Sequence, residues 1–209
     1  RKIKRNPLIG KNNVLFPLNL LKELNKMRIK HKFLPRQLNP ETEILIVGTF
    51  NPGINDNRAN FFYSRGHTSF WELMSAIFGE KCLRYSEKQE KEDFIKRHKI
   101  DFADLIEEID IATQDLSSYK DITLDENWNV VKCKNLPQEI SHLNKLKKVC
   151  FTRKTFQHIP NIRKKVEELE LWCKNKGIEF RGLTTPANYG KVDAQKRFEE
   201  WKAFFKEIK

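Results

Sequence analysis

The stretch ILIVGTFNPG, residues 44–53, decides the fold class of this chain. Four branched apolar residues predict a short buried strand at residues 44–47, which stops at Gly48 ahead of an Asn-Pro-Gly turn. A buried strand that opens into a polar turn is where α/β proteins commonly place their functional groups. Residues 49–53 are therefore the first candidate segment for a functional site.

Helices and strands are predicted to alternate along the rest of the chain. The apolar spacing predicts helices at residues 17–27, 69–79, 87–99, 161–177 and 193–208, and strands at 147–152 and 178–184. This order predicts an α/β fold, a three-layer α/β/α sandwich with a short, mainly parallel central sheet. Residues 1–30 are expected to be an N-terminal extension with a helix, and residues 31–209 a single domain. The last helix is expected to bury a stripe made of Phe198, Trp201, Ala203, Phe204 and Ile208.

Two polar loops follow strands at the carboxyl edge of the predicted sheet, where sites form in parallel sheets. They are residues 49–68 and residues 184–191. Both loops are rich in amides, hydroxyls and glycine. They are the segments in which functional residues are expected.

The charge of the chain favours a polyanionic partner. Forty Lys and Arg against 28 Asp and Glu give a net charge of +12, and the isoelectric point is near 9.5. DNA or another nucleic acid is the first candidate and an anionic membrane the second, although a lysine-rich, well-solvated surface would have the same composition.

No apolar run approaches the about 20 residues that span a bilayer. The start RKIKRNPLIG lacks an initiator Met and a hydrophobic signal core, which indicates a trimmed start. We therefore expect a cytoplasmic protein without membrane association, and a monomer.

The cysteines are Cys82, Cys133, Cys150 and Cys173, and no two of them form a CxxC pair. That spacing argues against a zinc ribbon or a clustered iron–sulfur site. We expect reduced, mostly buried thiols, and neither a metal nor another cofactor.

Several nucleotide-binding motifs are missing after Gly48. No GxxxxGK[ST] or GxGxxG pattern is present. Nucleotidyltransferases open on a similar Gly-Thr-Phe-Asp-Pro turn but need an HxGH pair just after it. Here GINDNR follows Pro52, and the first histidine of this loop is His67. A nucleotidyltransferase therefore remains an alternative that lacks its catalytic residues.

Three segments taken together resemble the uracil-DNA glycosylase superfamily. They are ILIVGTFNPG (44–53), NFFYSRGHTSFWELMSAIFG (60–79) and LTTPANYG (183–190). Their order and spacing are closest to the branch that acts on hypoxanthine, with its aromatic pair, its Phe-Trp helix start and its late Thr-Ser-Pro-Ala-Asn-like motif. The chain departs from that branch at Thr68, where the branch has a functional Asn, and at Asn51, where it has Met.

The resemblance implies a monofunctional, metal-independent DNA glycosylase. Such an enzyme flips a deaminated base, uracil or hypoxanthine, out of DNA and leaves an abasic site. The two departures leave room for an unusual modified base, including one that marks foreign or viral DNA. A non-catalytic nucleic-acid-binding protein with the same fold is a further alternative.

Four side chains are candidate catalytic groups. Cleavage of an N-glycosidic bond generates an oxocarbenium-like sugar, which needs a positioned water. Asn51 could hold that water or only shape the turn, and Asp104, with Asp101, is the alternative water-holder or a solvent-facing acid. His67 could donate to the leaving base or simply face solvent at the start of a helix.

The base pocket is predicted around Phe50, Phe62, Tyr63 and Thr68, because a flipped base needs aromatic faces in place of its lost stacking. One of Phe62 and Tyr63 is expected to face the base, and core packing is the alternative for both. Thr68 is also a candidate for the N-cap or N′ position of the helix that follows, with support from Glu72.

The DNA backbone is predicted to contact cations, hydroxyls and amides on the same rim. For the late loop, a plain connection between strand and helix is the alternative. The predicted DNA-binding residues are Arg65, Arg153, Lys154, Thr184, Thr185, Asn188, Tyr189 and Lys191.

Overall fold

The strand predicted at residues 44–47 is β2 (Ile44–Gly48), an inner strand of a four-stranded sheet. The computed structural model describes residues 27–66, 68–111, 119–187 and 193–206. In it the sheet has the order β3-β2-β6-β7, and every pairing is parallel. The predicted parallel central sheet is confirmed. Its other strands are β3 (Ile100–Asp104), β6 (Lys148–Phe151) and β7 (Glu179–Gly182).

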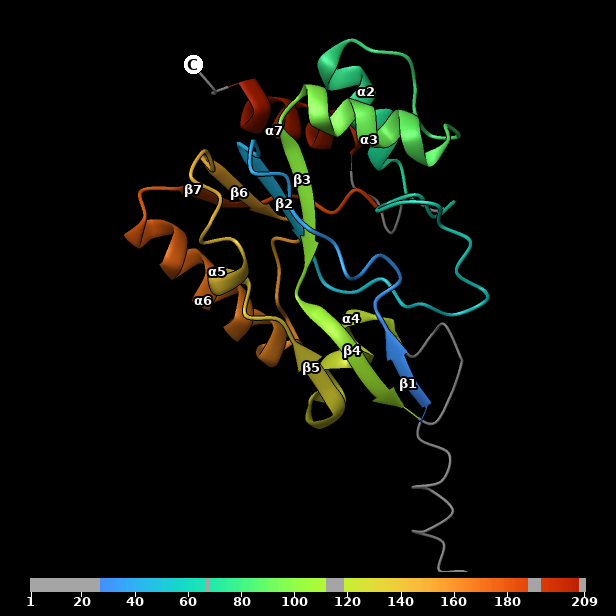
Figure 1. Cartoon of the computed structure of the whole chain (residues 1–209), viewed down its shortest axis with the longest axis vertical. Helices are drawn as coiled ribbons and strands as arrows, with labels where there is room; N and C mark the ends of the chain where they lie inside the picture. The colour runs from blue at the N-terminus through green and yellow to red at the C-terminus, as the bar shows by residue number, and fades with distance from the viewer. Residues whose placement is uncertain (1–26, 67, 112–118, 188–192, 207–209) are drawn as a thin grey trace, which may run out of the picture.

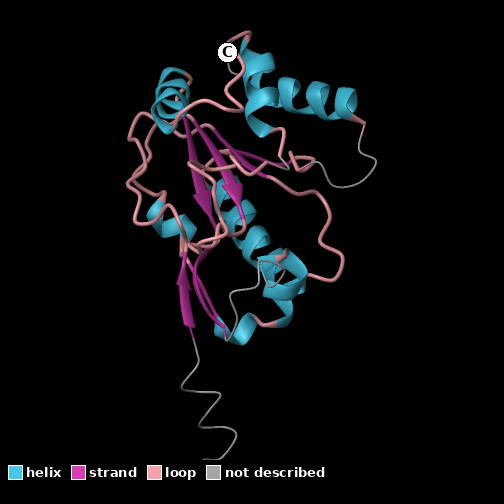
Figure 2. Cartoon of the chain, turned by 90° about the vertical axis from the view of Figure 1, so that its right-hand side faces the viewer, coloured by secondary structure: helices cyan, strands magenta, loops and turns pink. Residues whose placement is uncertain are grey.

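Helices cover both faces of this sheet (Figures 1 and 2), so the predicted three layers are confirmed. Alternate residues of β2 pack on opposite faces of the sheet. Ile44 and Ile46 belong to one apolar cluster, and Leu45 and Val47 belong to the other. The first face carries α2 (Phe70–Phe78), α3 (Lys88–Arg97) and α7 (Ala194–Lys206). The second carries α6 (Pro160–Asn175), with the short α5 (Leu136–Glu139) beside it.

A second, antiparallel sheet extends beyond the carboxyl ends of the parallel strands (Figure 1). Its order is β1-β4-β5, and the chain enters β4 directly from β3, through Leu105. The sequence did not predict this sheet, because acidic residues alternate along IEEIDI and weaken its apolar signal. The strands are β1 (Met27–Lys30), β4 (Ile106–Ile111) and β5 (Val131–Cys133), and α4 (Asp121–Glu126) with a 3₁₀ turn (Trp128–Val130) connects β4 to β5.

The N-terminal prediction lies largely outside the described residues. Of the helix expected at residues 17–27, only Met27 is described, and it begins β1. Because β1 pairs with β4, residues 27–30 are joined to the rest of the fold. The division into residues 1–30 and 31–209 stays a prediction.

Two helix details differ from expectation. Helix α2 ends at Gly79 in the left-handed conformation, as predicted, and Thr68 lies at N′, one of its two predicted positions, just before the N-cap residue Ser69. Glu72 pairs with Arg84 at 2.7 Å instead of supporting a cap. In α7, Ala203 is exposed, while Arg197, Trp201, Phe204 and Phe205 are buried and Phe198 is half-buried. Ile208 lies outside the described residues. None of the described helices is long and apolar enough to cross a membrane.

The thiols differ in access, which leads to a first testable prediction. Cys82 is exposed, Cys133 is half-buried, and Cys150 and Cys173 are buried. Burial raises the pKa of Cys133 to about 11 and that of Cys173 to about 12, so both stay protonated and unreactive near neutral pH. At about pH 8, where a free thiol reacts readily, we expect iodoacetamide to label Cys82 first, with the other three labelled fast only after unfolding. Peptide mass spectrometry after timed labelling measures this order, and fast labelling of Cys150 in the native protein would contradict it.

Candidate active site

Gly48, the last residue of β2, is the point at which polar side chains from separate segments converge. A Cβ atom at this position would lie 2.3 Å from Oδ1 of Asp104 and 2.7 Å from the hydroxyl oxygen of Tyr63. Asp104 ends β3, the neighbouring parallel strand, and pairs with Gly48 in the register. Only a glycine leaves room for both groups at this strand end.

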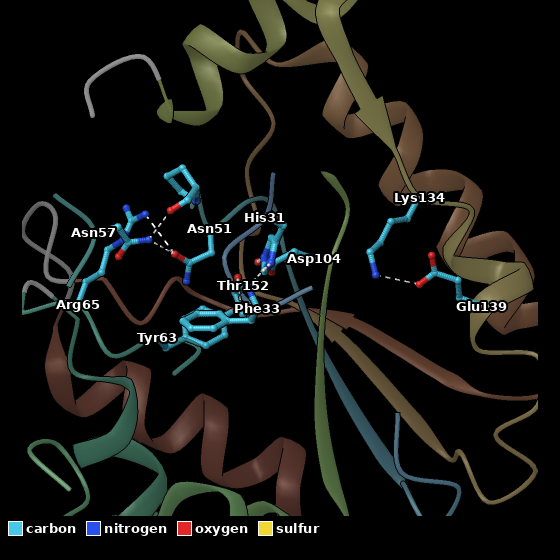
Figure 3. A network of polar contacts seen from close by, with 11 residues as sticks. His31, Phe33, Asn51, Asn57, Tyr63, Arg65, Asp104, Lys134, Glu139 and Thr152 are labelled. Atoms are coloured by element: carbon cyan, nitrogen blue, oxygen red, sulfur yellow. Dashed lines mark hydrogen bonds and ion pairs between the residues drawn. The ribbon is translucent and has the colours of Figure 1, made fainter. Parts of the chain in front are cut away.

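His31 holds the other oxygen of the Asp104 carboxylate. The His31 ring is 2% exposed, and its Nε2 lies 2.6 Å from Oδ2 of Asp104 (Figure 3). The backbone N–H of Phe33 donates to Nδ1 of His31 at 3.1 Å, so Nδ1 carries no proton. The ring is therefore neutral in this arrangement, with the proton on Nε2 and directed at the carboxylate. Oδ2 of Asp104 is thereby held, and Oδ1 is turned toward Gly48.

Tyr63 reaches the same strand end from the loop before α2. Its backbone has a positive φ of 54°, and the hydroxyl of Thr68 donates to the carbonyl oxygens of Tyr63 and Arg65, which closes this turn. The Tyr63 ring stacks on Phe70 at 4.6 Å, and its hydroxyl lies 3.2 Å from Oγ1 of Thr152, just after β6. Burial, and to a lesser extent the Asp104 carboxylate, raise the pKa of the Tyr63 phenol well above its ordinary value. The phenol is therefore a neutral hydrogen-bonding group.

The carboxamide of Asn51 is oriented by two donors. Its Oδ1 accepts from Nδ2 of Asn57 at 2.5 Å and from Nη2 of Arg65 at 3.3 Å (Figure 3). Because a guanidinium only donates, the atom facing Arg65 must be the oxygen. Nδ2 of Asn57 also donates to the carbonyl of Pro52 at 2.7 Å. Because a carbonyl only accepts, this contact fixes the orientation of the Asn57 carboxamide. Asn51 is 8% exposed, and because its oxygen is engaged, the amino group is the part of this carboxamide that could bind a ligand, as a donor.

The late loop contacts the loop that precedes α2. Thr68 forms an isolated antiparallel bridge with Ala187, and both the N–H and the hydroxyl of Ser69 donate to the carbonyl of Pro186. Arg197 of α7 adds donors to the carbonyls of Thr185 and Ala187 and to the Ser69 hydroxyl. Arg65, Thr68 and Ser69 thus form one connected rim with residues 185–187.

Several predicted phosphate contacts are engaged within the protein. Arg153 pairs with Asp121 at 2.7 Å, and Lys154 pairs with Glu200 at 2.9 Å. The Thr184 hydroxyl donates to Glu200 at 2.6 Å, and the Thr185 hydroxyl accepts from the backbone N–H of Ala187. The carboxylates of Asp121 and Glu200 therefore offset the positive charges of Arg153 and Lys154. His67, Asn188, Tyr189 and Lys191 lie outside the described residues.

Two predicted site residues are core or anchoring residues instead. Phe62 is 2% exposed and stacks on Phe102 at 5.2 Å, so its ring has no face for a base. Asp101 is 1% exposed and accepts from Arg36 and from the backbone N–H groups of Asn39 and Phe102, so it anchors loop to strand. Phe50 is half-buried, with its ring 5.8 Å from that of His31, and it remains at the edge of the site.

His31 and Asn57 were not predicted from the sequence. His31 lies 73 residues before Asp104, so nothing in the sequence shows that the two side chains meet. Asn57 is 3% exposed, but in the polar run GINDNR it looks like an ordinary loop residue. His31 directly follows β1, which was not predicted, and its burial is known only from the structure, so no signal in the sequence marked it.

A separate cavity lies elsewhere on the molecule. It has a volume of about 450 Å³ and is lined by residues 30, 34–38, 107, 134, 139 and 142. Lys134 and Glu139 on its wall form a separate ion pair, away from Asn51 and Tyr63 (Figure 3). None of the predicted site residues lines it. The candidate site is therefore defined by the contacts at Gly48 and not by that cavity.

A solved structure of another protein has a similar fold. It is a solution NMR structure of a protein from Methanosarcina acetivorans that is provisionally named a uracil DNA glycosylase. The TM-score is 0.58 at 21% sequence identity, with 85% of this chain and 96% of that chain covered. This likeness establishes the fold, while the predicted hypoxanthine branch stays a prediction. No protein-family model and no curated protein matches the sequence.

Proposed function

We propose that this chain is a DNA glycosylase that hydrolyses the N-glycosidic bond of a flipped base and leaves an abasic site. The observation that carries the proposal is the Asp104 carboxylate, held by a neutral His31 at 2.6 Å and turned toward the end of β2. The solved structure with the same fold supports the assignment through fold alone. The substrate class follows from the polar groups around that carboxylate.

In the proposed reaction Asp104 positions the water. A carboxylate only accepts hydrogen bonds, so Oδ1 can orient a water molecule for attack and take its proton. The water oxygen bonds to the sugar C1′ as the bond from C1′ to the base nitrogen breaks, and the base leaves with the electron pair. This assignment reverses the expected roles of Asp104 and Asn51, because the acceptor atom of Asn51 is already engaged with Asn57 and Arg65.

Asn51 is then proposed to bind the leaving base. Its amino group can donate to a carbonyl oxygen on which negative charge develops as the base departs. Uracil and hypoxanthine carry such an oxygen where cytosine and adenine carry an amino group, which is itself a donor. The orientation of Asn51 therefore favours deaminated bases, and a modified base that retains this carbonyl remains compatible with it.

The test is excision from oligonucleotides that each contain one uracil, hypoxanthine, xanthine or modified cytosine. We expect the wild-type protein to leave an alkali-labile site at uracil or hypoxanthine. Asn51→Ala should lower the single-turnover rate by about 100- to 1000-fold, as for the loss of one preorganised donor. Asn55→Ala is the matched control, since Asn55 is an exposed amide in the same loop.

Other results would replace the proposal. Binding of DNA without cleavage of any base would indicate a non-catalytic binding protein. Release of pyrophosphate from a free nucleotide would indicate a nucleotidyltransferase. Equal rates for wild type, Asn51→Ala and Asn55→Ala would remove Asn51 from the site.

A further inference from the structure

The turn between α2 and α3 presents an aromatic ring to solvent. Tyr85 is 87% exposed, more than any other large apolar side chain in the described part of the chain. The guanidinium of Arg84 lies over the Tyr85 ring, 5.3 Å from its centroid. This is the geometry of a cation–π contact, which restricts the orientation of both side chains.

The residues on each side of Tyr85 are anchored. Leu83 is 5% exposed and Ser86 is 8% exposed, so the chain is tied to the core immediately before and after the pair. The guanidinium of Arg84 donates to Glu72 at 2.7 Å and to the carbonyl of Gly66 at 3.1 Å. The exposed ring therefore projects from a fixed turn.

This turn is attached to the loop that builds the candidate active site. Nδ2 of Asn60 donates to the carbonyl of Ser86 at 3.2 Å, and Arg84 holds Gly66. Between these two contacts lie Tyr63 and Arg65, and Arg65 donates to Asn51. The ring thus belongs to the same connected structure as the proposed catalytic groups.

We propose that Tyr85, oriented by Arg84, is a stacking platform for an unpaired base of DNA beside the proposed active site. An exposed aromatic ring with an attached guanidinium stacks bases of any sequence, because every base has a π-face. The net charge of +12 favours a polyanion over other partners for such a ring. This inference rests on the proposed function only in taking DNA as the partner.

The test compares two single strands of equal length by fluorescence anisotropy, oligothymidylate and a strand of abasic tetrahydrofuran residues, each of about twelve nucleotides. The second strand has the phosphates but no bases. We expect Tyr85→Ala to weaken binding of oligothymidylate about 5- to 100-fold, as for the loss of one base–aromatic stack, without changing binding of the abasic strand. Tyr85→Trp should restore the affinity for oligothymidylate.

Leu171→Ala is the control, because Leu171 is 59% exposed and lies on α6, on the opposite face of the central sheet. The proposal is overturned if Tyr85→Ala weakens both strands equally or neither, or if the wild-type protein binds neither strand. If the wild-type protein binds neither strand, the exposed Tyr85 ring would instead be assigned to contact with a protein partner. A protein that excises no base but shows the expected difference between strands would lose the proposed reaction and keep this binding site.

Discussion

Asp104→Asn is expected to lower the rate of base excision by about 100- to 10,000-fold, the range for loss of a positioned proton acceptor. The amide keeps the size of the side chain, and its oxygen can still accept from Nε2 of His31. What it removes is the negative charge that the proposed reaction needs next to the water. Single-turnover kinetics on a uracil-containing oligonucleotide measure the effect, because they report the chemical step apart from product release.

The control for this variant is Asp93→Asn, an exposed carboxylate on α3 that bonds only to Gln89 among the hydrogen bonds found in the described residues. Asp93→Asn should excise at the wild-type rate. Asp104→Asn should also bind DNA with unchanged affinity. Asp104 is 6% exposed, and its side chain is an anion, so it makes no contact with phosphate that the substitution could remove. Wild-type activity in Asp104→Asn would assign the water to a different group.

Gly48→Ala is expected to lower both stability and activity. Its Cβ would lie 2.3 Å from Oδ1 of Asp104 and 2.7 Å from the Tyr63 hydroxyl, so at least one of these groups must move. Overpacking of this kind costs about 1–3 kcal/mol in the free energy of unfolding. A shift of Asp104 by even about 1 Å can lower the excision rate about 100-fold, because attack depends on near-contact alignment.

Urea unfolding measures the first effect, and the excision assay measures the second. Gly66→Ala is the matched control, because a Cβ there meets nothing within 4 Å and Gly66 is exposed. It carries the same change in backbone entropy as Gly48→Ala. If the two variants unfold at the same urea concentration and excise equally fast, the crowding at the end of β2 has no energetic consequence.

The fold could be predicted where each element carries its own pattern. The apolar run at 44–47, the helix that ends at Gly79 and the strands at 147–152 and 178–184 all have local signals, and the structure has elements at each. β3 was missed because IDFAD alternates acids with apolar residues, and both acids proved to be buried. Such a strand looks half-exposed until the partners of its carboxylates are known.

For the candidate site, the sequence indicated segments that come together but not how their side chains are partnered. Local sequence pointed to the turn after Gly48, to Tyr63 and to the late loop, and the structure connects these segments. Phe62 was wrong as a pocket residue because three successive aromatic rings cannot face one direction, and its ring joined the core against Phe102. Nothing within the loop sequence distinguished Phe62 from Tyr63, whose positive φ is imposed by the Thr68 contacts.

The sequence by itself determined a buried strand that ends in glycine and a polar turn, because those features depend on residues adjacent in the chain. Only the tertiary structure decided which hydrogen-bonding groups the turn and its neighbours offer to a ligand. The proton position on His31 depends on Phe33 and on Asp104, which is 73 residues away, and the donor character of Asn51 depends on Asn57 and Arg65. A side chain's chemistry is set by its hydrogen-bonding partners, and folding brings those partners together from separate segments.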